Sequence, residues 1–390
     1  MQKKISQWPS FSEEEAQAVS RVLLGNKVNY WTGNECKEFE KEFAHWSNTK
    51  YSIAVSNGTV AIEIALKAAG ISFDDEVIVT PRSFIASVSS VVNVGARPIF
   101  SDVDLNSGNI SASEISKKIS KKTKAIICVH LAGYPCEMDE IMHIARERNI
   151  IVIEDCAQAH GAKYKNQPVG SIGHIGCFSF CQDKIMTTGG EGGMITTSDE
   201  ILWKKMWSLK DHGKTIHSVY EKKHPPGYRW LHEEFGSNYR MTEMQATIGR
   251  IQLKKMKHWN KLRSNNANHL KKFFSNFSSL IRVPVVSDHI SHGWYKFNVY
   301  LKIDGILNSW SRDRISDEIN SLGTPCFSGS CSEIYLEEAF NNNYRPKKRL
   351  KNAKLLGETT LMFLIHPTIS KKEIEMHCDN IAKILNLAKK

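Results

Sequence analysis

Residues 176–193 are GCFSFCQDKIMTTGGEGG: a short apolar run typical of a buried strand, then a lysine, then a turn with four glycines. Lys184 stands at the junction of strand and turn, with Ser179 shortly before it. A lysine amine becomes a nucleophile when burial or neighbouring cations lower its pKa, and it then forms Schiff bases with carbonyl compounds. Taken alone, the stretch favours an ordinary exposed turn lysine. Whether Lys184 is instead a nucleophile therefore depends on the motifs found elsewhere in the chain.

Six further apolar runs of strand length accompany the run that starts this stretch. The seven expected strands are residues 51–55, 76–80, 98–102, 125–130, 150–154, 177–180 and 194–197. Helical patterns at 60–69, 85–94 and 137–148 separate several of them, and two helices at 11–24 and 36–46 come before. Apolar strands that alternate with helices predict an α/β fold with a large, mostly parallel, seven-stranded sheet covered on both faces.

The length of 390 residues suits two domains. We expect a large α/β domain over residues 1–250 and a small α+β domain over 251–390, joined by a long helix that begins within 236–256. In the small domain, strands are expected at 294–303 and 360–365, with helices at 311–321 and from residue 370.

Composition is that of an ordinary globular protein, with 41% hydrophobic and 24% charged residues. The N-terminus has no apolar leader, and no run approaches the roughly 18 apolar residues that a membrane-spanning helix needs. Nine cysteines without a CxxC pair fit a reducing compartment better than a disulfide framework. These features predict a cytoplasmic protein without membrane contact and without a metal site.

The net charge of +11 comes from the last third of the chain. Residues 251–390 hold 23 Lys and Arg against 12 Asp and Glu, whereas residues 1–250 hold 29 of each. Such a basic lobe can meet nucleic acid, an anionic membrane or a phosphorylated substrate. The densest segment, 345–354 (RPKKRLKNAK), is either a solvated helix start or a contact for a diphosphate.

Four of the expected strands end in unusually polar segments. Val55 is followed by SNGT, Thr80 by PRSF, Ile153 by EDCAQAHGA and Phe180 by CQDK. Ligands of open α/β sheets bind at the carboxyl ends of the strands. The four exits are therefore expected to form one site.

Each exit offers a different chemical group. Gly58 and Thr59 open a helix whose N–H groups can hold a phosphate. Phe84 can stack on a flat ring, although most aromatics in such places belong to the core. Asp155 follows a buried run, so its charge needs a partner: a salt bridge, a metal ion or a protonated ring nitrogen. A metal is poorly supported, because no second carboxylate or histidine recurs at the spacing of metal ligands. Gln158 adds a neutral amide.

A phosphate cradle, a stacking aromatic, an acid for a ring nitrogen and a Schiff-base lysine together describe pyridoxal 5′-phosphate (PLP). The chain also resembles the DegT/DnrJ/EryC1/StrS family of PLP-dependent sugar aminotransferases. The resemblance rests on segments in family order, among them AVSNGTVAIEIAL from Ala54, EDCAQAHGA from Glu154, FSFCQDK from Phe178, TTGGEGG from Thr187 and NYRMTEMQATIGRIQL from Asn238.

The resemblance implies the fold of the aspartate aminotransferase-like, type I PLP enzymes, and it implies roles for single residues. Lys184 would be the Schiff-base lysine and Asp155 the partner of the pyridine nitrogen. Gln158 would lie near the 3′-oxygen of the cofactor and Phe84 over its ring. The phosphate would be held by Gly58, Thr59 and Ser179, and by Asn238 of a neighbouring subunit, which implies a homodimer with shared sites.

The sequence departs from the family pattern in two places. Arg82 stands where the family has an uncharged residue, which predicts an unexpected charge near the ring. In the small domain, residues 323–335 (GTPCFSGSCSEIY) replace the usual His-Tyr and Pro-x-His pieces. These departures affect the substrate and leave the cofactor chemistry unchanged.

By resemblance, the reaction transfers an amino group, with L-glutamate as donor, to a nucleotide-diphosphate-linked keto-deoxysugar at C3 or C4, for surface polysaccharide or other amino-sugar biosynthesis. One alternative is a related PLP enzyme for a keto-cyclitol or an aromatic precursor. The other is a regulatory, nucleic-acid-binding protein on the same fold, suggested by the basic pI of about 9.1. An intact set of Lys184, Asp155 and Gln158 argues against this last possibility and against nucleic acid as a partner.

Overall fold

The computed structural model describes residues 6–341 and 343–390. Its centre is the predicted seven-stranded sheet, and the structure adds the strand order, which is β1-β9-β8-β5-β4-β2-β3. The strands are β1 (Tyr51–Val55), β2 (Glu76–Val79), β3 (Arg97–Phe100), β4 (Thr123–Val129), β5 (Ile151–Asp155), β8 (Ile175–Ser179) and β9 (Gly193–Thr197). β9 runs antiparallel to both of its neighbours, and the other strand pairs are parallel.

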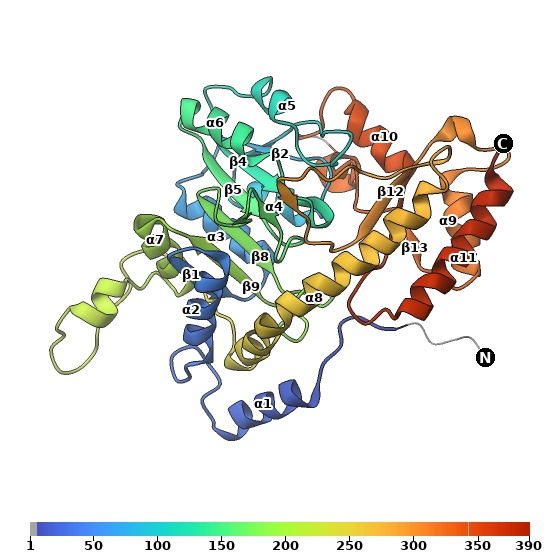
Figure 1. The fold of residues 1–390 in the computed structure, drawn as a ribbon. Helices are drawn as coiled ribbons and strands as arrows, with labels where there is room; N and C mark the ends of the chain where they lie inside the picture. The colour runs from blue at the N-terminus through green and yellow to red at the C-terminus, as the bar shows by residue number, and fades with distance from the viewer. Residues whose placement is uncertain (1–5, 342) are drawn as a thin grey trace.

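Helices cover both faces of this sheet (Figure 1). Along each strand, alternate residues point to opposite faces, so that Ile53 and Val55 pack into one core cluster and Ala54 into another. One face carries α3 (Gly58–Ala68), α4 (Ala86–Asn93) and α7 (Glu200–Lys210). The other carries α2 (Glu35–Ser47), α5 (Ala112–Ser116), α6 (Met138–Arg148) and the first half of α8 (Glu243–Ser275). The near-continuous apolar strands follow from this double cover.

The helix α1 (Glu13–Leu24) begins where the sequence predicts, because Ser12 and Glu15 form a capping box. No helix in the described part of the chain combines the length and apolarity needed to cross a membrane.

A second, antiparallel sheet lies in the C-terminal part, in the order β10-β12-β14-β13. Its strands are β10 (Ile281–Arg282), β12 (Phe297–Leu301), β13 (Cys326–Phe327) and β14 (Thr360–Phe363), covered by α9 (Arg312–Ser321) and α11 (Lys371–Ala388), with α10 (Lys351–Thr359) alongside. A small third sheet joins β6 (Lys163–Tyr164), β7 (Gln167–Pro168) and β11 (Ile290–Ser291).

The helix α8 joins the two cores. Ala246 and Leu253 pack in the core of the large sheet, whereas Leu270 and Phe274 pack under the second sheet. The predicted division between residues 250 and 251 falls inside this helix. The two sheets therefore share a rigid element, and the cleft described next lies between them.

Candidate active site

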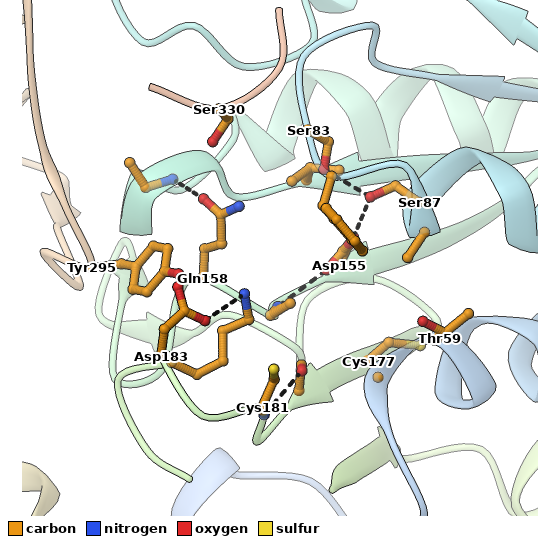
Figure 2. Close-up of a pocket in the computed structure, with 18 of the residues that line it drawn as sticks. Thr59, Ser83, Ser87, Asp155, Gln158, Cys177, Cys181, Asp183, Tyr295 and Ser330 are labelled. Carbon is orange, nitrogen blue, oxygen red and sulfur yellow. Dashed lines mark hydrogen bonds and ion pairs between the residues drawn. The ribbon is translucent and has the colours of Figure 1, made fainter. Parts of the chain in front are cut away.

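A cleft of about 980 Å³ opens where the polar strand exits meet the C-terminal sheet. Its lining contains all the predicted site residues except Asn238, namely Gly58, Thr59, Phe84, Asp155, Gln158, Ser179 and Lys184. The opposite wall comes from the C-terminal part and includes Lys296 and Cys331. Figure 2 shows two further residues of this wall, Tyr295 and Ser330. The four exits thus form one site, as the parallel strand order requires.

The start of α3 forms one end of the cleft. Gly58 and Thr59 are its first residues, and the N-cap residue Asn57 accepts a hydrogen bond from the Val60 N–H at 2.9 Å. The first N–H groups of a helix lack partners within it and favour anions. A Cβ on residue 58 would lie 2.7 Å from the Cβ of Ser179, so only glycine allows this close approach. The arrangement suits a phosphate group.

Asp155 ends β5 on the floor of the cleft and is 5% exposed. Its Oδ2 accepts a hydrogen bond from Ser87 Oγ at 2.7 Å and its Oδ1 accepts one from the Ala157 N–H at 3.1 Å. Burial raises the pKa of this carboxyl above its ordinary value, against the lowering effect of these hydrogen bonds and of Lys184. A protonated ring nitrogen in the cleft would supply the cationic partner that a buried carboxylate needs.

Gln158 and Phe84 flank this floor. The Oε1 of Gln158 accepts a hydrogen bond from the Ala132 N–H at 2.7 Å, which fixes the amide in the loop after β5. Phe84 lines the cleft and is 67% exposed, unlike a core aromatic. Both side chains are placed to contact a flat ligand above Asp155.

Lys184 reaches the cleft from the loop after β8. Its Nζ lies 3.5 Å from Oδ1 of Asp183 and 5.2 Å from the centre of the Tyr295 ring, and the Tyr295 hydroxyl donates to the other oxygen of Asp183 (Figure 2). The carbonyl of Lys184 accepts a hydrogen bond from the Trp8 indole at 2.7 Å. The amine is thus held among protein groups and is no solvated turn lysine.

The position of Arg82 corrects an expectation. Its side chain is fully buried and points away from the cleft, with Nη1 donating to the Tyr300 hydroxyl and Nη2 to Thr360 Oγ1, both at 2.9 Å. A Cβ on residue 108 would lie 2.2 Å from the guanidinium, so Gly108 makes the room. Arg82 therefore connects the loop after β2 to the second sheet and does not place a charge beside the ring.

The basic segment 345–354 does not line the cleft either. Arg349 pairs with Glu333, and Arg345 donates to the carbonyl of Tyr335 at 2.7 Å. The N–H groups of Asn352 and Ala353 donate to Asp102. These contacts hold the segment against the large domain, so the alternative of a contact with a diphosphate finds no support.

One buried group has the composition of a metal site. His130, Glu154 and Cys156 lie together, with His130 Nε2 3.0 Å from Glu154. Both oxygens of Glu154 also accept backbone N–H bonds, from Gly170 at 2.8 Å and from Gly173 at 2.6 Å. Burial raises the pKa of the Cys156 thiol. The protein's own hydrogen bonds therefore occupy the oxygens of Glu154, and these bonds connect β5 to the loop that contains Gly170 and Gly173.

Comparison with known proteins places the chain in a family. Residues 9–382 match the model of the DegT/DnrJ/EryC1/StrS aminotransferase family. The chain belongs to this family. It is 40% identical over 291 residues to the GDP-perosamine synthase of Escherichia coli O157:H7, covering 75% of this chain and 76% of that protein. It is 37% identical over 292 residues to the dTDP-3-amino-3,6-dideoxy-alpha-D-galactopyranose transaminase of Aneurinibacillus thermoaerophilus, covering 75% and 76%.

Solved structures that resemble this chain are also aminotransferases. The aminotransferase from Psychrobacter cryohalolentis has 57% sequence identity and a TM-score of 0.97, covering 99% of this chain and 100% of that one. DesV of S. venezuelae, solved with a ketimine intermediate, has 28% identity and a TM-score of 0.84, covering 95% and 94%. The protein is thus a PLP-dependent aminotransferase, and the phosphate-type helix start, the buried acid and the cleft lysine described above fit this cofactor.

Sequence reasoning missed several groups of this aminotransferase site. Ser87, which holds Asp155, lies on the helix after Phe84, and Asp183 directly precedes Lys184. Proximity to predicted residues could have found both. Tyr295 and Lys296 come from a distant part of the chain, and none of the segments quoted above includes them.

Proposed function

We propose that the protein transfers an amino group from L-glutamate to a nucleotide-diphosphate-linked keto-deoxysugar, at C3 or C4. The observation that carries the proposal is one cleft in which a lysine amine, a buried carboxylate and a helix N-terminus face the same space. The names of the relatives support a nucleotide-sugar acceptor. The free state of the nine cysteines supports the cytoplasm as the place of the reaction.

PLP, when bound, carries the amino group between the two substrates and spreads negative charge from the reacting carbon over its ring. Gly58, Thr59 and Ser179 would hold its phosphate, and Asp155 would keep a proton on its ring nitrogen. Lys184 would hold the cofactor through its Nζ. The same Nζ would serve as the general base and acid that moves a proton between two carbons.

Incubation of purified protein with glutamate and a panel of nucleotide-linked keto sugars, followed by mass spectrometry, tests this function. We expect one product heavier than its keto sugar by the difference between ammonia and oxygen, because the carbonyl oxygen is replaced by an amino group and a hydrogen, and 2-oxoglutarate in equal amount. Amination of a keto-cyclitol or an aromatic precursor, with none of the sugars converted, would replace the proposal by the related PLP reaction. Salt-dependent DNA binding without bound PLP would favour a regulatory protein.

We also propose a homodimer with shared sites. The segment between α7 and α8 projects from the body of the molecule (Figure 1) and exposes aromatic side chains, including Trp230 at 74% and Phe235 completely. Exposed apolar surface of this kind is typical of an interface. Asn238 lies at the base of this segment, is exposed, and does not line the cleft of its own chain. A second copy could therefore receive it.

Mixing two weakened variants tests the shared site. In a heterodimer of Lys184→Ala and Asn238→Ala, one site would combine the intact lysine with the intact asparagine. Because half of randomly mixed dimers are heterodimers and each has one intact site, roughly a quarter of the wild-type activity should return. Activity no greater than the sum of the two separate variants would contradict sharing of the site, and a monomer in light scattering would contradict the dimer.

A further inference from the structure

Lys296 lies at the boundary between the cleft and a second cavity. It directly precedes β12, and the N–H groups of Tyr295 and Lys296 both point to the carbonyl of Ala132, at 3.0 and 3.5 Å. The second cavity holds about 1130 Å³ and includes Trp8, Arg263 and His366 in its lining. Asp183, Tyr295 and Lys296 line both spaces. A substrate longer than the cleft would pass this boundary.

The ammonium group of Lys296 has no carboxylate of its own. Asp183 is the acid that acts on the pKa of Lys296. However, one of its oxygens already accepts a hydrogen bond from the Tyr295 hydroxyl, and the other already pairs with Lys184. The Lys296 Nζ lies 4.8 Å from the centre of the Tyr295 ring. Within residues 6–341 and 343–390, its side chain makes no hydrogen bond or salt bridge. This lysine is therefore available to an anion from outside the chain.

A second cation without an acid partner lies behind it. Arg263 of α8 is 1% exposed, and its Nη1 donates only to the carbonyls of Trp294 and Tyr295, each at 3.3 Å. Its Nε and Nη2 have no partner among the described residues. Charges in a poorly solvated wall act over longer distances than in water. Arg263 thus adds a positive field to the boundary without contacting a ligand itself.

We propose that Lys296 binds an oxyanion of a substrate at this boundary, either the carboxylate of the amino donor or the diphosphate of the nucleotide. The proposal rests on the proposed function only for the identity of these two substrates. A lysine ammonium is a compact charge well suited to carboxylate or phosphate oxygens. Lys184, in contrast, is needed for the chemistry and is not free to hold an anion through the cycle.

The charged neighbours of Lys296 also predict a pH dependence. Burial lowers its pKa to about 8, helped by Arg263 and Lys184 and opposed by Asp183. His366 and Tyr295 stay neutral, because burial lowers the pKa of His366 to about 3 and raises that of the Tyr295 phenol. The positive charge is present below the pKa and is lost above it. Oxyanion affinity should therefore fall as the pH rises through about 8.

Binding measurements on the PLP-loaded enzyme test the proposal. The probes are UDP, GDP and dTDP for the diphosphate and glutarate for the donor carboxylate, each titrated by calorimetry. We expect Lys296→Gln to weaken one class of probe by about 10-fold or more at pH 7, and Lys296→Arg to retain most of the affinity. With Lys296→Arg the affinity should also fall less than in wild type between about pH 7 and 8.5, because a guanidinium keeps its charge to higher pH than an ammonium.

Lys271→Gln is the matched control. Lys271 is half-buried and lies 4.7 Å from the centre of the Trp294 ring, close to the same segment, but it lines neither cavity. Its replacement should leave both classes of probe unaffected. Equal losses for Lys271→Gln and Lys296→Gln, or affinities within about 2-fold of wild type for every probe with Lys296→Gln, would overturn the proposal.

The two probe classes separate this proposal from the proposed function. Weaker binding of a nucleoside diphosphate alone assigns Lys296 to the acceptor, and weaker binding of glutarate alone assigns it to the donor. If wild type binds none of the nucleotides but converts glutamate, the nucleotide-sugar function fails. The glutarate series then still decides the role of Lys296.

Discussion

The two walls of the cleft are built in different ways. The wall from the large sheet is built from strand ends, helix starts and the loops that directly follow them: Asp155 and Ser179 end strands, Gly58 starts a helix, and Lys184 lies in the loop after β8. The opposite wall combines strand residues of the second sheet with loops, and the backbone at Tyr295 and Cys331 is hydrogen-bonded to Ala132 and Ser83 of the large domain. The ladder of one sheet positions the first wall, whereas contacts between distant segments position the second.

This difference separates two tasks. Groups that hold a cofactor and carry charge need fixed geometry, which regular elements supply. Groups that recognise a variable substrate can lie on loops placed by that scaffold. Changes in the first wall should therefore mainly affect the chemical step, and changes in the second should mainly affect substrate binding.

The strongest test of the first wall is Lys184→Ala. Because the variant lacks both the bond to the cofactor and the group that moves the proton, we expect kcat to fall by about 1000-fold or more. The visible absorbance of bound PLP should change in the same variant. Lys255→Ala, which removes another partly buried lysine beside an acid, Glu15, outside the cleft, serves as the control. Near-normal turnover by Lys184→Ala would exclude the assignment.

Asp155→Ala should have the next largest effect. Loss of this buried carboxylate removes the partner of a protonated ring nitrogen, and we expect kcat/KM to fall by about 100-fold, with weaker retention of PLP in dialysis. Asp155→Glu should recover part of the loss because it keeps the charge. A variant with unchanged kcat and unchanged PLP affinity would show that Asp155 is a structural acid.

Arg82→Met tests how the two walls are joined. The Tyr300 and Thr360 hydroxyls lose their donor, so the free energy of unfolding in urea should fall by about 1–3 kcal/mol. Because the loop after β2 is tied to the second wall here, KM for the acceptor should rise more than kcat falls. Arg314→Met is the control, since Arg314 also stacks on an aromatic ring, that of Trp310 at 4.2 Å, but donates to the Ser309 carbonyl within the C-terminal part itself. Equal effects of the two variants would refute a joining role for Arg82.

Ser87→Ala should give the smallest change. Its hydroxyl lowers the pKa of Asp155, so its loss should move the acidic limb of the pH–rate profile to higher pH and reduce kcat by about 3- to 10-fold. Ser83→Ala removes a hydroxyl that contacts Ser87 at 2.8 Å and not Asp155. A pH profile that moves as far with Ser83→Ala as with Ser87→Ala would argue against a direct role of the Ser87 hydrogen bond.

The contact that makes Arg82 structural could not be predicted from the sequence. Arg82 follows a strand exit, and in the sequence its charge lies two residues from Phe84. Its partners Tyr300 and Thr360 are more than 200 residues away in the chain. Only the docking of the second sheet brings them together, and this depends on side-chain packing along α8 that local patterns do not encode.

Local patterns along the chain were sufficient to predict the seven-stranded α/β sheet and the wall of the cleft that this sheet forms. Apolar strand runs bury both faces of a sheet, and parallel strands bring their polar exits to one edge, so local patterns were enough to gather Lys184, Asp155 and Gly58. Only the tertiary structure shows how the wall around Tyr295 and Ser330 is built and where the side chain of Arg82 points. It also shows that Lys296 has no ion-pair partner among the described residues. These features depend on packing between residues far apart in the chain and on which charged side chains form ion pairs. Patterns in a local stretch of sequence determine neither the packing nor the pairing.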